Sequence, residues 1–225
     1  MTTPLPRIDR RRLLGGAAGL AGLAALPGCG ALAALGGATE VLDAYELRPP
    51  QTGPVATGTV ARSLIVETPS AAGAIDTDRI LIRPHPLQAQ YLPRARWTET
   101  APVMVQTLLL RTLEDAGGLR FVGRRPLAGA GDFALVSELT AFQADVPGAP
   151  EGAAAAVSVR LLARLVREAD AAVLSTRAFS AAAPVPRLET LAVVEAFDIA
   201  LSQVLAETAR WALSGVGVRL AAPSG

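Results

Sequence analysis

The sequence predicts an α/β fold of the α+β kind: a two-layer domain with a mixed, mostly antiparallel sheet and two long helices packed on it. Two segments, residues 101–116 and 188–213, have the apolar repeat of an amphipathic helix. About seven shorter runs are β-prone and end at proline, glycine or a turn of small residues. Apolar residues make up 51% of the 225 residues and charged residues 18%, which is typical of a globular chain.

Four strands are expected between residue 41 and the first helix. The predicted strands cover residues 43–47, 63–67, 79–83 and 91–97, and proline- and glycine-containing loops separate them. The last of these strands contains Pro93, which cannot donate a hydrogen bond to a neighbouring strand. We therefore expect this strand to lie at an edge of the sheet or to contain a bulge.

The first helix is predicted to run from residue 101 to residue 116. Its apolar face is formed by Val105, Leu108, Leu109, Leu113 and Ala116. Thr98 or Thr100 can cap the start of the helix, and Pro102 suits its first turn. The glycine pair that follows residue 116 is expected to end it.

The second half of the chain predicts an antiparallel meander followed by the second helix. A short strand over residues 119–122 precedes β-prone runs at 132–144, 157–165 and 173–179. The helix over 188–213 has one apolar stripe and an opposite polar side, so we expect it to lie on the sheet. With no clear break after residue 40, residues 41–215 are predicted to form one domain and residues 216–225 a C-terminal tail.

Residues 1–28 are predicted to be an export signal rather than a membrane span. The apolar run from Leu13 to Leu26 is 14 residues long, whereas a bilayer-spanning helix needs roughly 20. Basic residues precede this run, as they do in a secretory signal. The triplet Arg10-Arg11-Arg12 also resembles a twin-arginine signal, so the general secretory route and the twin-arginine route both stay open.

The only cysteine, Cys29, stands where the apolar run ends. The segment Leu26-Pro27-Gly28-Cys29 resembles the lipobox of bacterial lipoproteins, with Pro27 where a small or aliphatic residue is usual. The resemblance implies that Cys29 is lipidated and becomes the N-terminus after cleavage. Because Ala31 to Ala38 are mostly small residues, residues 29–40 are predicted to be a flexible tether. Gly30 in place of an aspartate favours the periplasmic face of the outer membrane, with the inner membrane as the alternative. A plain secretory signal cut after Ala31-Leu32-Ala33 would instead leave a soluble periplasmic protein.

The composition excludes several classes of site. The net charge is +1, of which residues 1–28 carry +3, so the remainder has no general attraction for nucleic acid. One cysteine and one histidine leave no ligand set for a metal ion, and the histidine, His85, stands in a loop where no Ser-His-Asp arrangement is compelling. No phosphate-binding loop followed by Lys-Ser or Lys-Thr is present. We therefore expect no catalytic residues, no metal, no cofactor and no enzymatic activity.

One cluster, Arg94, Arg96 and Trp97, is a candidate partner-binding surface, because arginine and tryptophan are enriched in binding hot spots. The alternative is a tryptophan packed under the following helix, with the two arginines at the edge of the sheet. The sequence leaves both interpretations open, and the position of the tryptophan side chain distinguishes them.

Several short motifs follow the lipobox in a fixed order. They are Tyr45-Glu46-Leu47, Leu64 to Pro69, Asp76-Thr77-Asp78-Arg79-Ile80, Ala95-Arg96-Trp97, Asp132-Phe133-Ala134-Leu135 leading to Phe142, and a helix ending near Trp211. Their order and spacing over residues 40–214 resemble the ABC-type transport auxiliary lipoprotein component family.

The resemblance implies a lipid-anchored, non-enzymatic adaptor subunit of an ABC-type lipid transport system of the mammalian-cell-entry type. The implied partners are the membrane, the mammalian-cell-entry-type substrate-binding subunit and the ABC permease complex. Self-association into a homo-oligomer stays open. Two alternative functions remain, a structural lipoprotein of outer-membrane assembly and a soluble periplasmic hydrolase.

Overall fold

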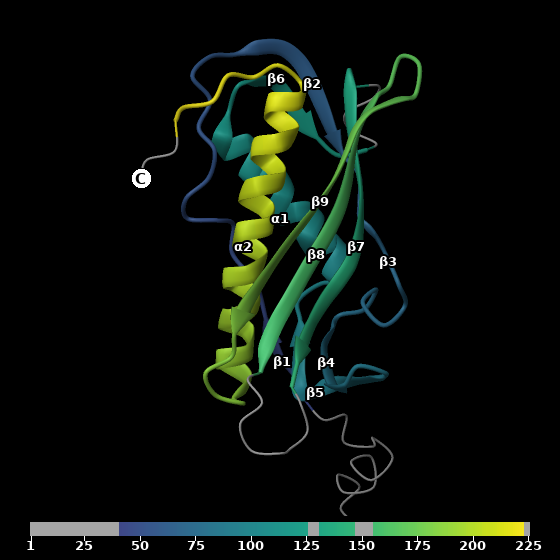
Figure 1. Ribbon diagram of the computed structural model, residues 1–225, viewed down its shortest axis with the longest axis vertical. Helices are drawn as coiled ribbons and strands as arrows, with labels where there is room; N and C mark the ends of the chain where they lie inside the picture. Colours follow the sequence, from purple (N-terminus) through teal and green to yellow (C-terminus); the bar gives the residue numbers. More distant parts are fainter. Residues whose placement is uncertain (1–40, 126–130, 147–154, 223–225) are drawn as a thin grey trace, which may run out of the picture. The chain divides into compact units, whose positions relative to one another are not determined.

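Strand β7 (Phe133–Asp145) is the centre of a mixed sheet (Figure 1). In the computed structural model, which describes residues 41–125, 131–146 and 155–222, nine strands join this sheet. The other strands are β1 (Asp43–Tyr45), β2 (Val60–Val66), β3 (Ser70–Ala71), β4 (Arg79–His85), β5 (Gln88–Trp97), β6 (Leu119–Gly123), β8 (Ala156–Arg167) and β9 (Ala172–Pro184). Two helices, α1 (Ala101–Ala116) and α2 (Thr190–Gly215), complete the described elements, and all of them belong to the unit Leu42–Gly225.

The long strand pairings of the sheet are antiparallel. β7 pairs with β8, and β8 with β9, over 12 residue pairs each, which confirms the predicted meander. On its other side β7 pairs in parallel with β2, β3 and β4 over two or three residue pairs each. β4 continues to β5 and β1, and β2 continues to β6, so the sheet order is β1-β5-β4-β7-β2-β6. The predicted α+β fold, a mixed sheet with two helices packed on it, is confirmed.

A bulge in β7 determines which of its side chains face the helices. Buried side chains alternate from Leu135 to Leu139 and resume at Phe142, because the register with β8 shifts between Leu139 and Ala141. Without the extra residue, the second half of the strand would turn its apolar side chains to the opposite face. The bulge therefore keeps Phe142 and Ala144 in the core.

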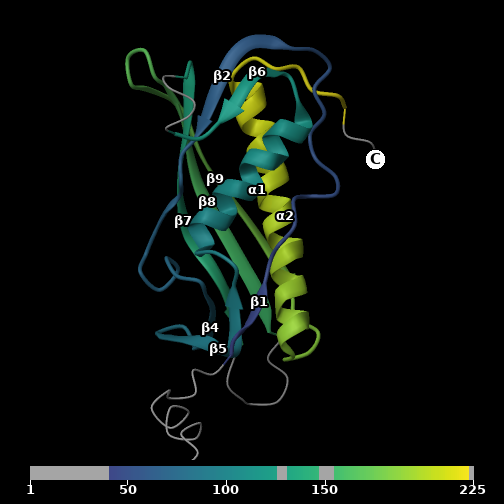
Figure 2. The ribbon, with the colours of Figure 1, turned by 180° about the vertical axis from the view of Figure 1, so that it is seen from behind.

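The two helices pack beside each other. α2 lies on β8 and β9, while α1 contacts β2 and β6 (Figures 1 and 2). The apolar stripe predicted for α2, from Val194 to Ala212, is buried along its length. α1 starts after Thr100 and ends before Gly117, as predicted, but the Thr100 side chain makes no capping hydrogen bond. Proline in the first turn suits the start of α1, because its missing N–H needs no partner there.

Gly118 allows three segments to meet at the end of α1. Its φ angle is +88°, a conformation that glycine adopts without strain. A Cβ atom at this position would lie 2.5 Å from Cγ1 of Val218 and 2.6 Å from Cβ of Ala56. The close approach therefore requires glycine at position 118.

The segment after α2 packs on the domain. The sequence predicts a tail from residue 216, whereas Val216 and Val218 are buried. The backbone N–H of Thr57 donates to the carbonyl of Arg219 at 2.9 Å, and that of Ala221 to the carbonyl of Val55 at 2.8 Å. The folded part therefore continues to at least residue 221.

Three aromatic rings join the sheet to α2 at the end that holds β1, β4 and β5. Ring centroids of Trp97 and Phe197 are 5.3 Å apart, those of Phe142 and Phe197 4.8 Å, and those of Trp97 and Phe142 5.9 Å. β5 contains the bulge expected from Pro93, and Arg94 adopts a φ of +53° there. The bulge lies just before Ala95 and Trp97, which are fully buried.

Candidate functional site

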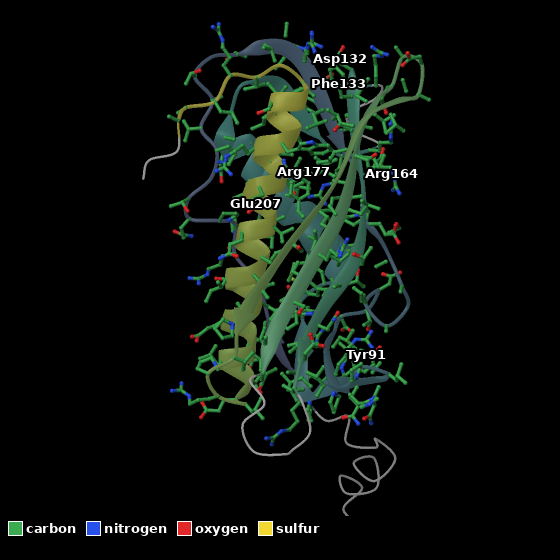
Figure 3. The ribbon with its side chains drawn as sticks, in the orientation of Figure 1. Tyr91, Asp132, Phe133, Arg164, Arg177 and Glu207 are labelled. Carbon is green, nitrogen blue, oxygen red and sulfur yellow. The ribbon has the colours of Figure 1, made fainter. Side chains whose placement is uncertain are left out.

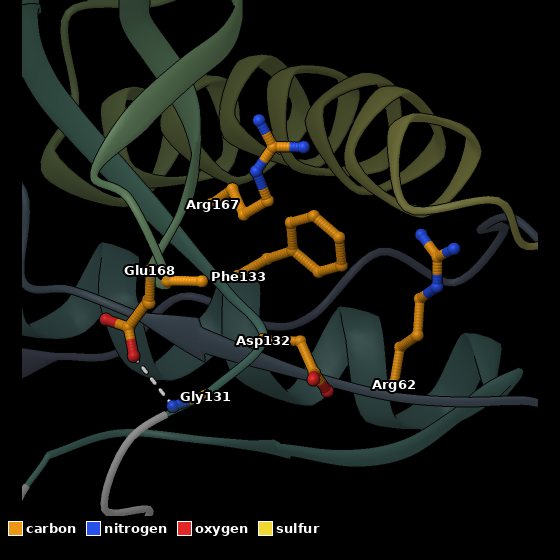
Figure 4. A pocket seen from close by; sticks show the side chains of 7 residues that line it. Arg62, Gly131, Asp132, Phe133, Arg167 and Glu168 are labelled. Atoms are coloured by element: carbon orange, nitrogen blue, oxygen red, sulfur yellow. Dashed lines mark hydrogen bonds between the residues drawn. The ribbon is translucent and has the colours of Figure 1, made fainter.

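A surface pocket of about 490 Å³ lies where the start of β7 meets β2 and the turn between β8 and β9 (Figure 4). It is lined by Arg62, Gly131, Asp132, Phe133, Arg167, Glu168 and Ala169. Asp132 and Phe133 lie at the end of the unit opposite Tyr91 (Figure 3). The pocket combines an aromatic ring with four charged side chains, which makes it the candidate site of the domain.

Asp132 and Ser63 bind each other reciprocally. Oδ2 of Asp132 accepts hydrogen bonds from the backbone N–H of Ser63 at 2.7 Å and from its hydroxyl at 2.8 Å. The backbone N–H of Asp132 donates to the same hydroxyl at 3.0 Å. The hydrogen bonds from Ser63, aided by the charges of Arg120 and Arg62, lower the pKa of Asp132 below its usual value. This clamp holds the start of β7 against β2.

Glu168 fastens the opposite wall of the pocket. Its Oε2 accepts from the backbone N–H of Gly131 at 2.7 Å, and its Oε1 accepts from the guanidinium of Arg125. Arg125 also donates from Nε to Oε1 of Glu67 at 2.6 Å. The hydrogen bond to Glu67, and to a smaller extent the one to Glu168, raises the pKa of Arg125. The arginine thus links the ends of β2, β6 and β8.

The two arginines that line the pocket, Arg62 and Arg167, also have partners within the domain. The guanidinium of Arg62 lies 5.4 Å from the ring centroid of Phe133 and donates to the carbonyl of Val216 at 3.1 Å. Arg167 donates to both carboxylate oxygens of Asp170 at 3.0 Å. Each charge that lines the pocket therefore already has a partner within the domain.

The polar side chains around this pocket form hydrogen bonds and ion pairs with one another. The Ser63 hydroxyl donates to the Asp132 carboxylate, which also accepts from the backbone N–H of Ser63. His85 lies on β4, where its Nδ1 accepts from the backbone N–H of Leu87 at 3.3 Å. Within residues 41–125, 131–146 and 155–222, no group of three or more His, Cys, Asp or Glu side chains could hold a metal ion.

The structure separates the three predicted partner-binding residues. Trp97 is fully buried between Phe142 and Phe197, so it packs under α2, and it offers no surface to a partner. Arg96 lies on the outer side of the sheet, where its guanidinium is 3.5 Å from Oδ2 of Asp78. Arg94 is exposed at the bulge of β5. Arg94 and Arg96 therefore remain candidates, and Trp97 belongs to the core.

The proposed lipidation site lies outside the described residues. Cys29 and the lipobox residues Leu26, Pro27 and Gly28 all precede residue 41. Neither α1 nor α2, the helices of the described part of the chain, has the length and hydropathy needed to cross a bilayer.

Sequence reasoning missed the contacts that build the pocket. Ser63 and Asp132 are 69 residues apart, and Arg125 and Glu168 are 43 residues apart. One signal was present, since Asp132 opens the motif Asp132-Phe133-Ala134-Leu135. Nothing in the sequence pairs this aspartate with a particular serine.

The elements from β1 to α2 coincide with a known family model. The model of the ABC-type transport auxiliary lipoprotein component matches residues 45–209. The chain belongs to this family. The description of this family is that of an auxiliary lipoprotein component of ABC-type transport.

Three relatives illustrate the extent of the similarity. The crystal structure of protein XCC0632 from Xanthomonas campestris is 30% identical, covers 77% of this auxiliary lipoprotein and 96% of that chain, and has a TM-score of 0.66. An uncharacterised protein of Bradyrhizobium diazoefficiens is 28% identical over 80% of this chain, which spans about half (47%) of that relative's length. A crystal structure of another uncharacterised protein, 17% identical, covers 76% of this chain and 98% of its own, with a TM-score of 0.57, and shares the fold.

Proposed function

We propose that this auxiliary lipoprotein is anchored in the envelope through a lipid on Cys29 and serves as a non-catalytic adaptor of an ABC-type lipid transport system. Its partner is a substrate-binding subunit of the mammalian-cell-entry type, which works with the ABC permease. The anchor lies on the periplasmic face of the outer membrane. Residues 1–28 are the signal that export removes, and residues 29–40 are the tether.

The observation that carries this proposal is the extent of the family match. It runs from Tyr45 in β1 to Ala209 in α2 and so includes the sheet and both helices. A match to one motif would support only a local likeness, whereas this one includes the core that joins Trp97 to Phe197. The auxiliary role therefore belongs to the folded domain as a whole.

The state of the pocket supports a non-catalytic role. Asp132 accepts two hydrogen bonds from Ser63, and Glu168 accepts from Gly131 and Arg125. Side chains engaged in this way hold strands together, whereas a general acid or base must direct a proton or a lone pair toward a substrate. The contacts join β2, β7 and the β8–β9 turn, which gives an adaptor a rigid end.

The anchor is tested by growing cells with a fatty-acid probe and isolating the protein. We expect the wild type to incorporate the probe and Cys29→Ala to remain unlabelled. Equal incorporation by both proteins would contradict the anchor. Fractionation of the labelled protein then tests the outer-membrane location against the inner membrane.

The partnership is tested by crosslinking in cells and purification of the complex. We expect a substrate-binding subunit and permease components to co-purify with the wild type. Arg94→Glu should reduce their recovery if the bulge of β5 touches the partner, and Arg111→Glu, on α1, is the matched control. Recovery of outer-membrane assembly proteins in place of transporter subunits would instead support the structural alternative.

A further inference from the structure

The hairpin formed by β4 and β5, residues 79–97, concentrates positive charge. It contains Arg79, Arg83, Arg94 and Arg96 and no aspartate or glutamate. From residue 41 to the end the net charge is −1, and this hairpin alone contributes +4. Among the described residues its guanidinium groups form one ion pair, between Arg96 and Asp78 at 3.5 Å. The hairpin is therefore a cationic element on an otherwise acidic domain.

The tip of this hairpin exposes a large apolar side chain. Leu87 follows Pro86 at the turn, and 91% of its surface is accessible. Arg83 donates to the carbonyl of Pro86 at 3.3 Å, which places a cation beside the tip. At the base, the hydroxyl of Tyr91 donates to the carbonyl of Ala74 at 3.4 Å, while the guanidinium of Arg79 lies 5.7 Å from its ring centroid. The base is thus fastened to the domain, and the leucine points into solvent.

The chain enters the folded unit directly beside this hairpin. β1 pairs in parallel with the end of β5, Ala44 opposite Arg96 and Asp43 opposite Ala95 (Figures 1 and 2). The connection from β9 to α2 lies at the same end and exposes Leu188 by 71%. From Cys29 to Asp43 an extended chain spans about 50 Å at most. A lipid on Cys29 would therefore keep this end of the domain within that distance of the bilayer.

We infer that the β4–β5 hairpin contacts the surface of an anionic phospholipid bilayer, with Leu87 entering the interface and Arg83 and Arg94 facing the lipid phosphates. The inference rests on the proposed anchor for its biological setting. Burial of an apolar tip and attraction of arginines to anionic lipid are the two contributions that hold peripheral proteins on membranes. Guanidinium groups also match phosphate oxygens in geometry. The hairpin presents both contributions, whereas the pocket at the opposite end has its charges neutralised within the domain.

The test uses the full chain in a Cys29→Ala background, so that its outcome does not depend on lipidation. Leu87→Cys then supplies the only thiol, which carries an environment-sensitive fluorophore. Val173→Cys, 56% exposed at the start of β9, is the matched control position. Each labelled protein is mixed with vesicles of phosphatidylcholine alone or with about 30% phosphatidylglycerol. The N-terminal segment is the same in both proteins, so the comparison of the two positions does not depend on it.

We expect a blue shift and an increase in emission at position 87 with the anionic vesicles, and no shift at position 173. Adding Arg83→Gln and Arg94→Gln should reduce the affinity for anionic vesicles about tenfold or more, since each cation near such a surface contributes to binding. Arg210→Gln with Arg219→Gln is the charge-matched control and should have little effect.

Equal shifts at positions 87 and 173, or none at either, would overturn the inference. A probe at 87 that stays in water with vesicles but is buried when the transporter subunit is added would show that the hairpin binds protein instead. If the wild type incorporates no fatty-acid probe while the fluorophore at position 87 still shows its blue shift, the anchor is disproved and the lipid contact stands.

Discussion

The carboxylate of Asp198 on α2 accepts three hydrogen bonds from Arg48, one from its backbone N–H at 2.9 Å and two from its guanidinium at 2.6 and 3.1 Å. The two residues are 150 positions apart. The side-chain hydrogen bond to Asp198 is the largest cause of the raised pKa of Arg48. This contact fastens the segment that follows β1 to the outer surface of the helix.

Asp198→Ala should loosen the entry of the chain into the domain. Backbone amides of residues 43–48 are expected to exchange with deuterium about tenfold faster or more, because the loss of charge-assisted hydrogen bonds favours local opening. Glu195→Ala is the control, since Glu195 influences Arg48 only through its charge. Unchanged exchange in Asp198→Ala would show that β1 is held by its pairing with β5 alone.

The Ser63–Asp132 clamp should make stability depend on pH. The folded-state pKa of Asp132 is lowered, so its contribution is present above the unfolded pKa of about 3.9 and is lost as pH falls through the folded value. In urea unfolding, we expect Asp132→Asn to be less stable than the wild type at pH 7. The difference should begin to shrink near pH 4, where the carboxylate of the unfolded chain becomes protonated, and should disappear as the pH falls through the lowered folded-state pKa.

Ser63→Ala tests the other partner of this clamp. It removes the hydroxyl that donates to Oδ2 of Asp132 and accepts from its backbone N–H. A loss of about 1 kcal/mol in the free energy of unfolding is expected. Ser180→Ala, an exposed serine on β9, should change stability by less than about 0.5 kcal/mol. Equal effects of the two substitutions would mean that the clamp contributes nothing measurable.

Substitutions in the glycine pair after α1 measure backbone strain and steric clash separately. Both residues have positive φ, +67° for Gly117 and +88° for Gly118, but only Gly118 has close neighbours. Gly117→Ala should cost about 1–3 kcal/mol from the backbone alone, because φ +67° with ψ −161° is a conformation that essentially only glycine adopts. Gly118→Ala should cost about 1–3 kcal/mol more, because the new Cβ meets Val218 and Ala56. Thermal unfolding of the two variants side by side measures the difference.

The aromatic cluster should dominate the stability of the core. Phe197→Ala removes the ring that contacts both Trp97 and Phe142, and a loss of about 3–5 kcal/mol is expected. Ile199→Ala, two residues along the same helix and 53% exposed, should cost less than about 1 kcal/mol. Similar losses in both variants would indicate that helix propensity, rather than ring packing, determines the result.

Local patterns predicted the elements of the fold well. The apolar spacing of α1 and α2 gave helices whose ends differ from the observed ones by two residues or fewer. Pro93 predicted the bulge in β5 because a missing N–H interrupts pairing wherever the strand lies. The meander of β7, β8 and β9 could be predicted because turns separate β-prone segments that are neighbours in sequence, and such segments pair as hairpins.

Non-local relationships could not be predicted in the same way. The parallel pairings of β7 with β2, β3 and β4 join short strands far apart in sequence, and no local signal sets their register. The clamp between Ser63 and Asp132 depends on that register. Val216 and Val218 alternate over too few residues to predict that the segment after α2 is buried. The candidate pocket is built from such relationships, which explains why it emerged only from the structure.

The cluster of Trp97, Phe142 and Phe197 has a consequence for the order of folding. Its rings come from positions spread over 100 residues, and the last of them lies on the final helix. Contacts of such long sequence separation form slowly, because the chain between them must first be ordered. A nascent chain that has not yet produced α2 cannot complete this core. The domain therefore acquires its native structure only after α2 has been synthesised.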